Sequence, residues 1–316
     1  MKYLRPVFFI VGIAILFLVV RRSGLHSFVQ AVASLDWRFT FLALASYLAI
    51  NIARVERLTL ILHHKTTRQH LYAVIFLQNF LNLFLSFSGD AAYVSLLNRR
   101  KTLAPGENVA SLLSTKILDL GTLAVIFLAS IFFVASPRME PFRLPALGVL
   151  AAVLTTIGIL MVYPKIAEAY VASTGRALGV DKRPLFIALH QNIARVGEGF
   201  FLRQKDVLAQ IIVATLANWV FTFLCGFFLL RGVGIMIDTW QMVFAYSLPM
   251  IVSLTPVFVL GGFGSFEATL VFGLLIVGVG AGQAIPASLL IHIEEFAFIT
   301  LCAAAGFILY DFQGTL

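Results

Sequence analysis

The chain has 316 residues, of which 60% are hydrophobic and only 12% are charged, and its mean hydropathy is +0.96. Soluble domains are about half apolar and a quarter charged, so this composition excludes a soluble enzyme or binding module and indicates an integral membrane protein. The net charge of +8 arises from short basic clusters between apolar segments. Such clusters are typical of membrane topology and contact with anionic lipid, so no nucleic-acid partner is expected.

The amino terminus, MKYLRPVFFIVGIAILFLVVRRSG, has the basic start and apolar run of a signal peptide. Arg21 and Arg22 follow Val20 where a small-residue cleavage site would be needed, so an uncleaved first span at 4–20 is predicted. A membrane span needs about 20 residues, and most of the later apolar segments reach that length. These segments lie at 39–62, 71–88, 109–134, 145–162, 207–230, 240–260, 266–280 and 284–310.

Two shorter stretches, 25–35 and 183–205, have apolar residues at helical spacing. They suit helices that lie in the membrane interface. An ordinary cytosolic connecting helix is an equally good interpretation of 183–205.

The distribution of basic residues predicts that 71–97 enters and leaves the membrane on one face. A re-entrant hairpin that turns near SFSGDAAY places 16 of the 23 Lys and Arg in the cytoplasm, 6 outside, and one, Lys116, in the bilayer. Cytoplasmic loops carry such an excess, so both termini are expected in the cytoplasm, with the chain in the inner membrane. Irregular backbone at membrane depth needs burial or a wet cavity, which makes the hairpin tip a candidate site.

A second hairpin is expected at 240–280, where proline and glycine interrupt an apolar stretch before Glu267. The interrupting residues are Pro249, Pro256, Gly261, Gly262 and Gly264.

The two hairpins predict an inverted repeat, an architecture common in secondary transporters. Asp90 and Asp119 are 29 positions apart, while Glu267 lies 27 and 28 positions before Glu294 and Glu295. The expected fold is an all-α polytopic integral membrane protein with about six full spans plus two re-entrant hairpins. A single transmembrane domain, 1–316, would comprise a first half at 1–162, an amphipathic cytoplasmic connector at 163–206 and a second half at 207–316.

Charged residues inside apolar segments are candidates for function, because each costs about 2.5–3.5 kcal/mol at the bilayer centre. Lys116 and Asp119 share a helix face and can pair, either to orient helices or to handle a substrate or ion. Asp90 and Glu267 each follow glycines at a helix restart, where a carboxylate can act as a cap or as part of a site.

Two other groups of polar residues in or near the spans are candidates for function. Glu294 and Glu295 lie on neighbouring faces of the last span beside His292, so at least one should face protein or water. Arg54 and Arg57 share a face, and they suit either snorkelling to the interface or binding a phosphate.

The sequence contains no soluble catalytic motif, and we expect neither enzymatic activity nor a cofactor. Cys225 and Cys302 lie in apolar segments without metal-ligand spacing, and the adjacent His63 and His64 have no third ligand nearby.

Several of these segments resemble the lysylphosphatidylglycerol synthase transmembrane family, also called the flippase-like domain, over roughly residues 10–310. They are QNFLNLFLSFSGDAA, STKILDLG, the Arg54/Arg57 pair and SLPMIVSLTPVFVLGGFGSFEATL. The resemblance implies translocation of a lipid between leaflets. Full-length synthases of this group add a soluble aminoacyl-transferase domain, so this chain is not expected to make lysyl lipid by itself. Its first motif lacks the proline and arginine that family members tend to carry beside the acid.

The expected function is transport of a phospholipid or polyprenyl-type lipid between leaflets, with anionic phospholipid as the main partner. The alternative is a non-transporting accessory subunit of a lipid-modifying or cell-envelope enzyme. A second copy of the chain or a lipid-synthesis enzyme is a further possible partner. Five acids, Asp90, Asp119, Glu267, Glu294 and Glu295, are expected to line one cavity around Lys116. The candidate substrate-binding residues are Arg54, Arg57, Asn82, Asp90, Lys116, Asp119, Gly262, Gly264, Glu267, Glu294 and Glu295.

Overall fold

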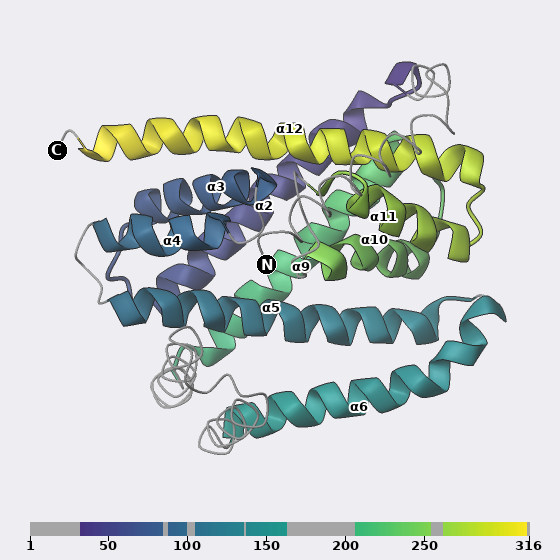
Figure 1. Cartoon of the computed structure of the whole chain (residues 1–316), viewed down its shortest axis with the longest axis horizontal. Helices are drawn as coiled ribbons and strands as arrows, with labels where there is room; N and C mark the ends of the chain where they lie inside the picture. The colour runs from purple at the N-terminus through teal and green to yellow at the C-terminus, as the bar shows by residue number, and fades with distance from the viewer. Residues whose placement is uncertain are drawn as a thin grey trace, which may run out of the picture.

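The computed structural model of the chain describes residues 32–84, 88–99, 105–135, 137–162, 206–253 and 262–314. Over these ranges the secondary structure is helical, with nine α-helices, one short 3-10 helix and no strand (Figure 1). The expected all-helical, membrane-embedded fold is therefore confirmed. The predicted span at 4–20, the stretch 183–205 and most of 25–35 lie outside the described residues.

Four of the described helices are long and apolar enough to cross a membrane. A fifth long helix, α6 (Glu140–Val162), lies along α5. The four candidate spans are α2 (Trp37–Ile61), α5 (Pro105–Phe133), α9 (Leu208–Gly232) and α12 (Ala281–Gly314).

Between these long helices lie two pairs of short helices. Their lengths of 17, 12, 15 and 12 residues fall below the roughly 20 residues of a full span. The members of each pair pack against each other, at the two positions where the sequence predicts hairpins. The first pair is α3 (Arg68–Phe84) with α4 (Ser88–Arg99), and the second is α10 (Thr239–Ser253) with α11 (Ser265–Ile276).

Local sequence explains where some of these helices begin. Asp36 caps α2 by accepting a hydrogen bond from the Arg38 amide at 3.0 Å. Gly264, at φ +87°, precedes α11 in a conformation that favours glycine. Pro249, which is among the residues expected to interrupt the helix of the second hairpin, instead lies inside α10. Proline is tolerated within membrane helices because neighbouring groups satisfy the freed backbone, so this part of the prediction is wrong.

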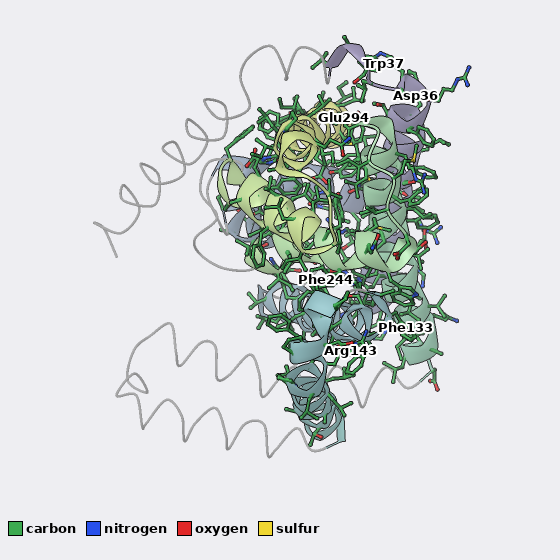
Figure 2. The ribbon with its side chains drawn as sticks, turned by 90° about the vertical axis from the view of Figure 1, so that its right-hand side faces the viewer. Asp36, Trp37, Phe133, Arg143, Phe244 and Glu294 are labelled. Atoms are coloured by element: carbon green, nitrogen blue, oxygen red, sulfur yellow. The ribbon has the colours of Figure 1, made fainter. Side chains whose placement is uncertain are left out.

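The helix ends gather at two opposite ends of the molecule. At one, the Lys65 end, the Lys65 ammonium pairs with Glu107 at 2.8 Å, joining the α2–α3 loop to the start of α5. At the other, the Trp240 end, Trp240 stacks on Phe133 with ring centroids 4.5 Å apart. Figure 2 looks onto the Trp240 end. The α3–α4 pair lies toward the Lys65 end and the α10–α11 pair toward the Trp240 end (Figure 1).

Helices from the two halves of the chain pack against one another. Helices α2 and α9 pack side by side along their length at the centre (Figure 1). Around them, α3 packs on α12 and α10 packs on α5, so that each short pair contacts the long helix of the other half. This packing brings polar side chains from both halves to the centre of the bundle.

Candidate functional site

A cavity of about 330 Å³ lies among α2, α3, α4, α5, α9 and the end of α10. Apolar and aromatic side chains, including those of Tyr93 and Trp219, form part of its wall. Its charged and amide lining consists of Arg54, Arg57, Gln78, Asn79, Asn82, Asp90, Lys116, Asp119 and Asn218.

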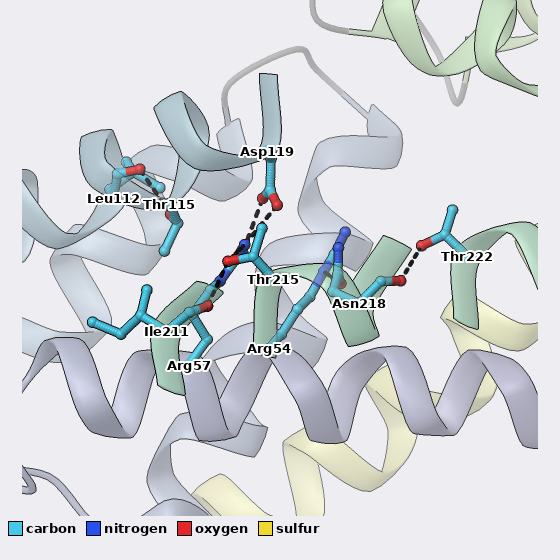
Figure 3. A network of polar contacts seen from close by, with 9 residues as sticks. All are labelled: Arg54, Arg57, Leu112, Thr115, Asp119, Ile211, Thr215, Asn218 and Thr222. Carbon is cyan, nitrogen blue, oxygen red and sulfur yellow. Dashed lines mark hydrogen bonds and ion pairs between the residues drawn. The ribbon is translucent and has the colours of Figure 1, made fainter. Parts of the chain in front are cut away.

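Arg57 is buried and held by a bidentate ion pair. Its guanidinium donates to the two carboxylate oxygens of Asp119 on α5 at 2.6 and 2.9 Å (Figure 3). Thr215 on α9 accepts a longer bond of 3.4 Å from the same guanidinium. The snorkelling interpretation is wrong for Arg57, because a carboxylate inside the bundle supplies the counter-charge that the interface would otherwise provide.

Arg54 lies one turn earlier on α2 and has a different environment. Its Nε donates to the Asn218 side-chain oxygen at 3.2 Å (Figure 3). A terminal nitrogen donates to the side-chain oxygen of Asn79 at 3.1 Å. Asn79 in turn donates to Asn51 at 3.2 Å. Both acceptors are neutral amides, and within the described ranges no carboxylate pairs with Arg54.

Lys116 pairs with Asp90 at 2.9 Å, and Gln78 donates to the same carboxylate at 3.0 Å. The predicted pair between Lys116 and Asp119 is therefore not formed. Both residues face the cavity from α5, as their spacing indicates, but each finds its partner on a different helix. Asn82 accepts a hydrogen bond from the Gly89 amide at 2.9 Å and so joins α3 to the start of α4.

The three glutamates of the second half do not line this cavity, and the expectation of one acidic lining around Lys116 is wrong for them. They lie in a separate cluster, which we call the Glu267 cluster, formed where α11 and α12 pack together beside α10 and α2. Glu267 accepts from the Gly264 amide at 2.6 Å and bonds His292 Nδ1 at 2.8 Å. The five acids therefore divide between two sites, Asp90 and Asp119 at the cavity and the three glutamates in the Glu267 cluster.

The other two acids of the Glu267 cluster are held by side-chain hydroxyls. Glu294 accepts from Thr40 on α2 at 2.6 Å, and Glu295 accepts from the Tyr246 hydroxyl on α10. The expectation that at least one of them faces protein is confirmed for both. Gly262, at φ +75°, and Gly264 form the turn that enters α11, so their contribution is to the backbone.

Sequence reasoning missed the amides and His292. Gln78, Asn79 and Asn218 are polar residues in apolar segments, and that isolation is a signal that could have singled them out. His292 was noticed in the sequence but left out of the site, because only the packing of α11 on α12 brings its ring to Glu267.

The electrostatics of the cavity favour an anion. Two of its cations, Arg57 and Lys116, are each paired with a carboxylate, whereas Arg54 contacts neutral amides. The charged side chains of the described lining thus carry one net positive charge. A guanidinium with fixed neutral neighbours in a partly buried cavity is suited to a phosphate or carboxylate.

A family model, described as the lysylphosphatidylglycerol synthase TM region, matches residues 7–303. Comparison with curated proteins and with solved structures found no match to the chain. The matched range includes every residue of the cavity and of the Glu267 cluster named above. The chain therefore belongs to the lysylphosphatidylglycerol synthase TM region family.

Proposed function

We propose that the protein moves a phospholipid or polyprenyl-type lipid between the leaflets of the inner membrane, with the lipid headgroup bound in the cavity at Arg54. Membership of the family indicates a role related to membrane lipids. The observation that carries the finer proposal is the charge pattern of the cavity, in which Arg54 alone among the described lining cations has no carboxylate partner.

Arg54 would bind the headgroup phosphate. Its two described hydrogen bonds go to Asn79 and Asn218, which fix the guanidinium without neutralising it. Charge-assisted bonds from arginine to phosphate are stronger than neutral ones, and the planar fork adds specificity. The amides of Gln78 and Asn82 can hydrogen-bond other headgroup atoms. The cavity volume of about 330 Å³ falls within the range of about 300–1,000 Å³ typical of small-ligand sites.

We assign the cavity to transport and not to catalysis. Asp90 and Asp119 are each held in an ion pair with a cation of the protein, at 2.9 and 2.6 Å, so neither carboxylate is left free to act on a substrate. The cavity also draws its lining from both halves of the chain, as expected for a site whose access changes when the halves move.

The proposed membrane arrangement places the long helices across the bilayer, with the Lys65 end in the cytoplasm. In it, the α3–α4 and α10–α11 pairs are re-entrant hairpins from opposite faces, related as an inverted repeat. The short helices and the reciprocal packing of each pair on the other half support this arrangement.

Single-cysteine labelling tests the orientation. Both native cysteines are buried and can be replaced by alanine. In that background, we expect Lys65→Cys to react with an impermeant reagent only from the cytoplasm and Asp238→Cys only from outside. Labelling of both positions from one side would contradict the arrangement. Position 100, in the loop on which the sequence prediction depends, lies outside the described residues.

Translocation in proteoliposomes tests the function. With a fluorescent phosphatidylglycerol as the probe, we expect Arg54→Gln to slow transfer between leaflets about tenfold or more, because a hydrogen bond to a charged group contributes about 1.5–3 kcal/mol. Arg38→Gln is the matched control, since Arg38 is exposed at the Trp240 end and should transport at the wild-type rate. A folded wild-type protein without transfer would favour the accessory-subunit alternative.

A further inference from the structure

The Glu267 cluster repeats the arrangement of the cavity. In the first half, Asp90 in the first turn of α4 pairs with Lys116 on the next long helix at 2.9 Å. In the second half, Glu267 in the first turn of α11 pairs with His292 on the next long helix at 2.8 Å. The acid precedes its partner by 26 positions in the first half and by 25 in the second.

A further acid completes the correspondence. Asp119 follows Lys116 by three positions, and Glu295 follows His292 by three. Each pairs with a residue from another helix, Asp119 with Arg57 and Glu295 with Tyr246. The two clusters therefore match in spacing and in pairing, as equivalent sites of the proposed inverted repeat would, and differ in their side chains.

The two equivalent sites differ in access. The side chains of Lys116 and Asp90 are 41% and 12% exposed and line the cavity, whereas those of His292 and Glu267 are 4% and 0% exposed. Alternating access in an inverted repeat opens one half of the protein while the other half is closed, which produces such an asymmetry. The structure thus represents a state in which the first half is open and the second half is closed.

The chemistry of the closed site indicates a proton as its ligand. Both carboxylate oxygens of Glu267 are already bonded, one to the Gly264 amide and the other to His292. The His292 ring lies between the rings of Phe263 and Phe266, each with its centroid 4.4 Å away. Among the described residues no group of His, Cys, Asp and Glu is arranged to hold a metal ion. A proton is a cation that can bind in this closed site without a cavity, and histidine is the side chain suited to exchange a proton near neutral pH.

We propose that the Glu267–His292 pair binds a proton and that release of this proton opens the second half while the cavity of the first half closes. The proposal deepens the proposed transport function and rests on it for its role, which is to supply the coupling ion. The proton would leave His292 for water at the Trp240 end, where α10 begins and α11 ends.

The direction of the pH effect follows from burial. With His292 protonated and Glu267 ionised, the closed pair is neutral overall. Loss of the proton leaves a buried carboxylate without its counter-charge, which favours opening to water. The titratable group nearest to both members of the pair is Glu295 on α12, and Glu294, Tyr246 on α10 and Cys225 on α9 lie around Glu295. Low pH should therefore favour the described state, and high pH the opposite one.

Fluorescence of Trp219, which lines the cavity, tests the proposal. The chain has three tryptophans, so Trp37→Phe with Trp240→Phe leaves only this reporter. In phosphatidylcholine vesicles, we expect its emission to move reversibly to shorter wavelengths as the pH rises from about 5 to about 8, the range of histidine, because the cavity loses water.

Two variants decide whether His292 causes this shift. His292→Gln keeps a hydrogen-bond donor beside Glu267 but cannot titrate, and Glu267→Gln removes the carboxylate that holds the proton. We expect the pH-dependent shift to be lost in both. The control is His70→Gln, since His70 is also buried but stacks on Tyr310, toward the Lys65 end. No shift in the wild-type reporter, or a shift that persists in either folded variant, would overturn the proposal.

The fluorescence assay separates this proposal from the proposed function. A His292-dependent shift without translocation of any lipid would leave the proton site standing and refute transport. Translocation that depends on Arg54, together with Trp219 emission that is independent of His292, would support transport and refute the proton site.

Discussion

Replacement of Asp119 by asparagine is expected to lower the free energy of unfolding by about 3–5 kcal/mol, the cost of leaving a buried charge without its partner. Arg57 is 3% exposed and donates two hydrogen bonds to this carboxylate, at 2.6 and 2.9 Å. Asparagine offers one acceptor oxygen and no charge, so the guanidinium would remain buried and largely uncompensated. Reversible unfolding of the purified protein in mild detergent measures the effect.

The matched control for this ion pair is Glu107→Gln. Glu107 pairs with Lys65 at a similar distance, 2.8 Å, but both side chains are 46% exposed. Exposed ion pairs contribute about 0–1 kcal/mol, so little change is expected. The double variant Arg57→Met/Asp119→Leu should recover most of the stability, because it removes both charges together. Equal effects of Asp119→Asn and Glu107→Gln would contradict the role given to the buried pair.

Gly89→Ala is expected to destabilise the first helix pair by about 3 kcal/mol or more and to reduce translocation with it. A β-carbon on Gly89 would lie 2.0 Å from the backbone oxygen of Gln78 and 2.7 Å from the Asn82 side chain. Backbone cannot move aside as a flexible side chain can, so α3 and α4 must separate. Gln78, Asn82 and Asp90 all line the cavity, so this separation would change its shape.

Gly148→Ala is the control for the glycine prediction. Gly148 lies inside α6, and an added β-carbon there would meet no atom within 4 Å. Alanine has the higher helix propensity by about 1 kcal/mol, so this variant should be as stable as the wild type or slightly more so. A Gly89→Ala protein within about 0.5 kcal/mol of the wild type would show that the two helices are not held at this distance.

The sequence was sufficient to predict the two helix pairs and the candidate spans. Apolar length identifies α2, α5, α9 and α12, because insertion of a helix depends on its own composition. Glycine near Asp90 and Glu267 marks the start of α4 and α11, because these interruptions are local backbone properties. The spacing of the acids also indicated the equivalence of the two halves.

The partners of the charged residues were decided by tertiary structure. Helical spacing places Lys116 and Asp119 on one face of α5, but not which helix lies opposite. Because α5 packs against α2 and α4, Asp119 forms its ion pair with Arg57 and Lys116 forms its ion pair with Asp90. The same limitation explains the glutamates: Glu267 pairs with His292, away from the cavity, because α11 packs on α12.

The sequence by itself thus determined that this chain is a helical membrane protein with acids at similar spacings in its two halves. Hydrophobicity, helix spacing and glycine act within one segment, so they can be recognised without knowledge of the neighbours. Only the tertiary structure decided that one set of acids lines a cavity with Arg54 and that the other is buried around His292. That division depends on which helices pack together, α5 with α2 and α4, and α11 with α12, which no single segment encodes.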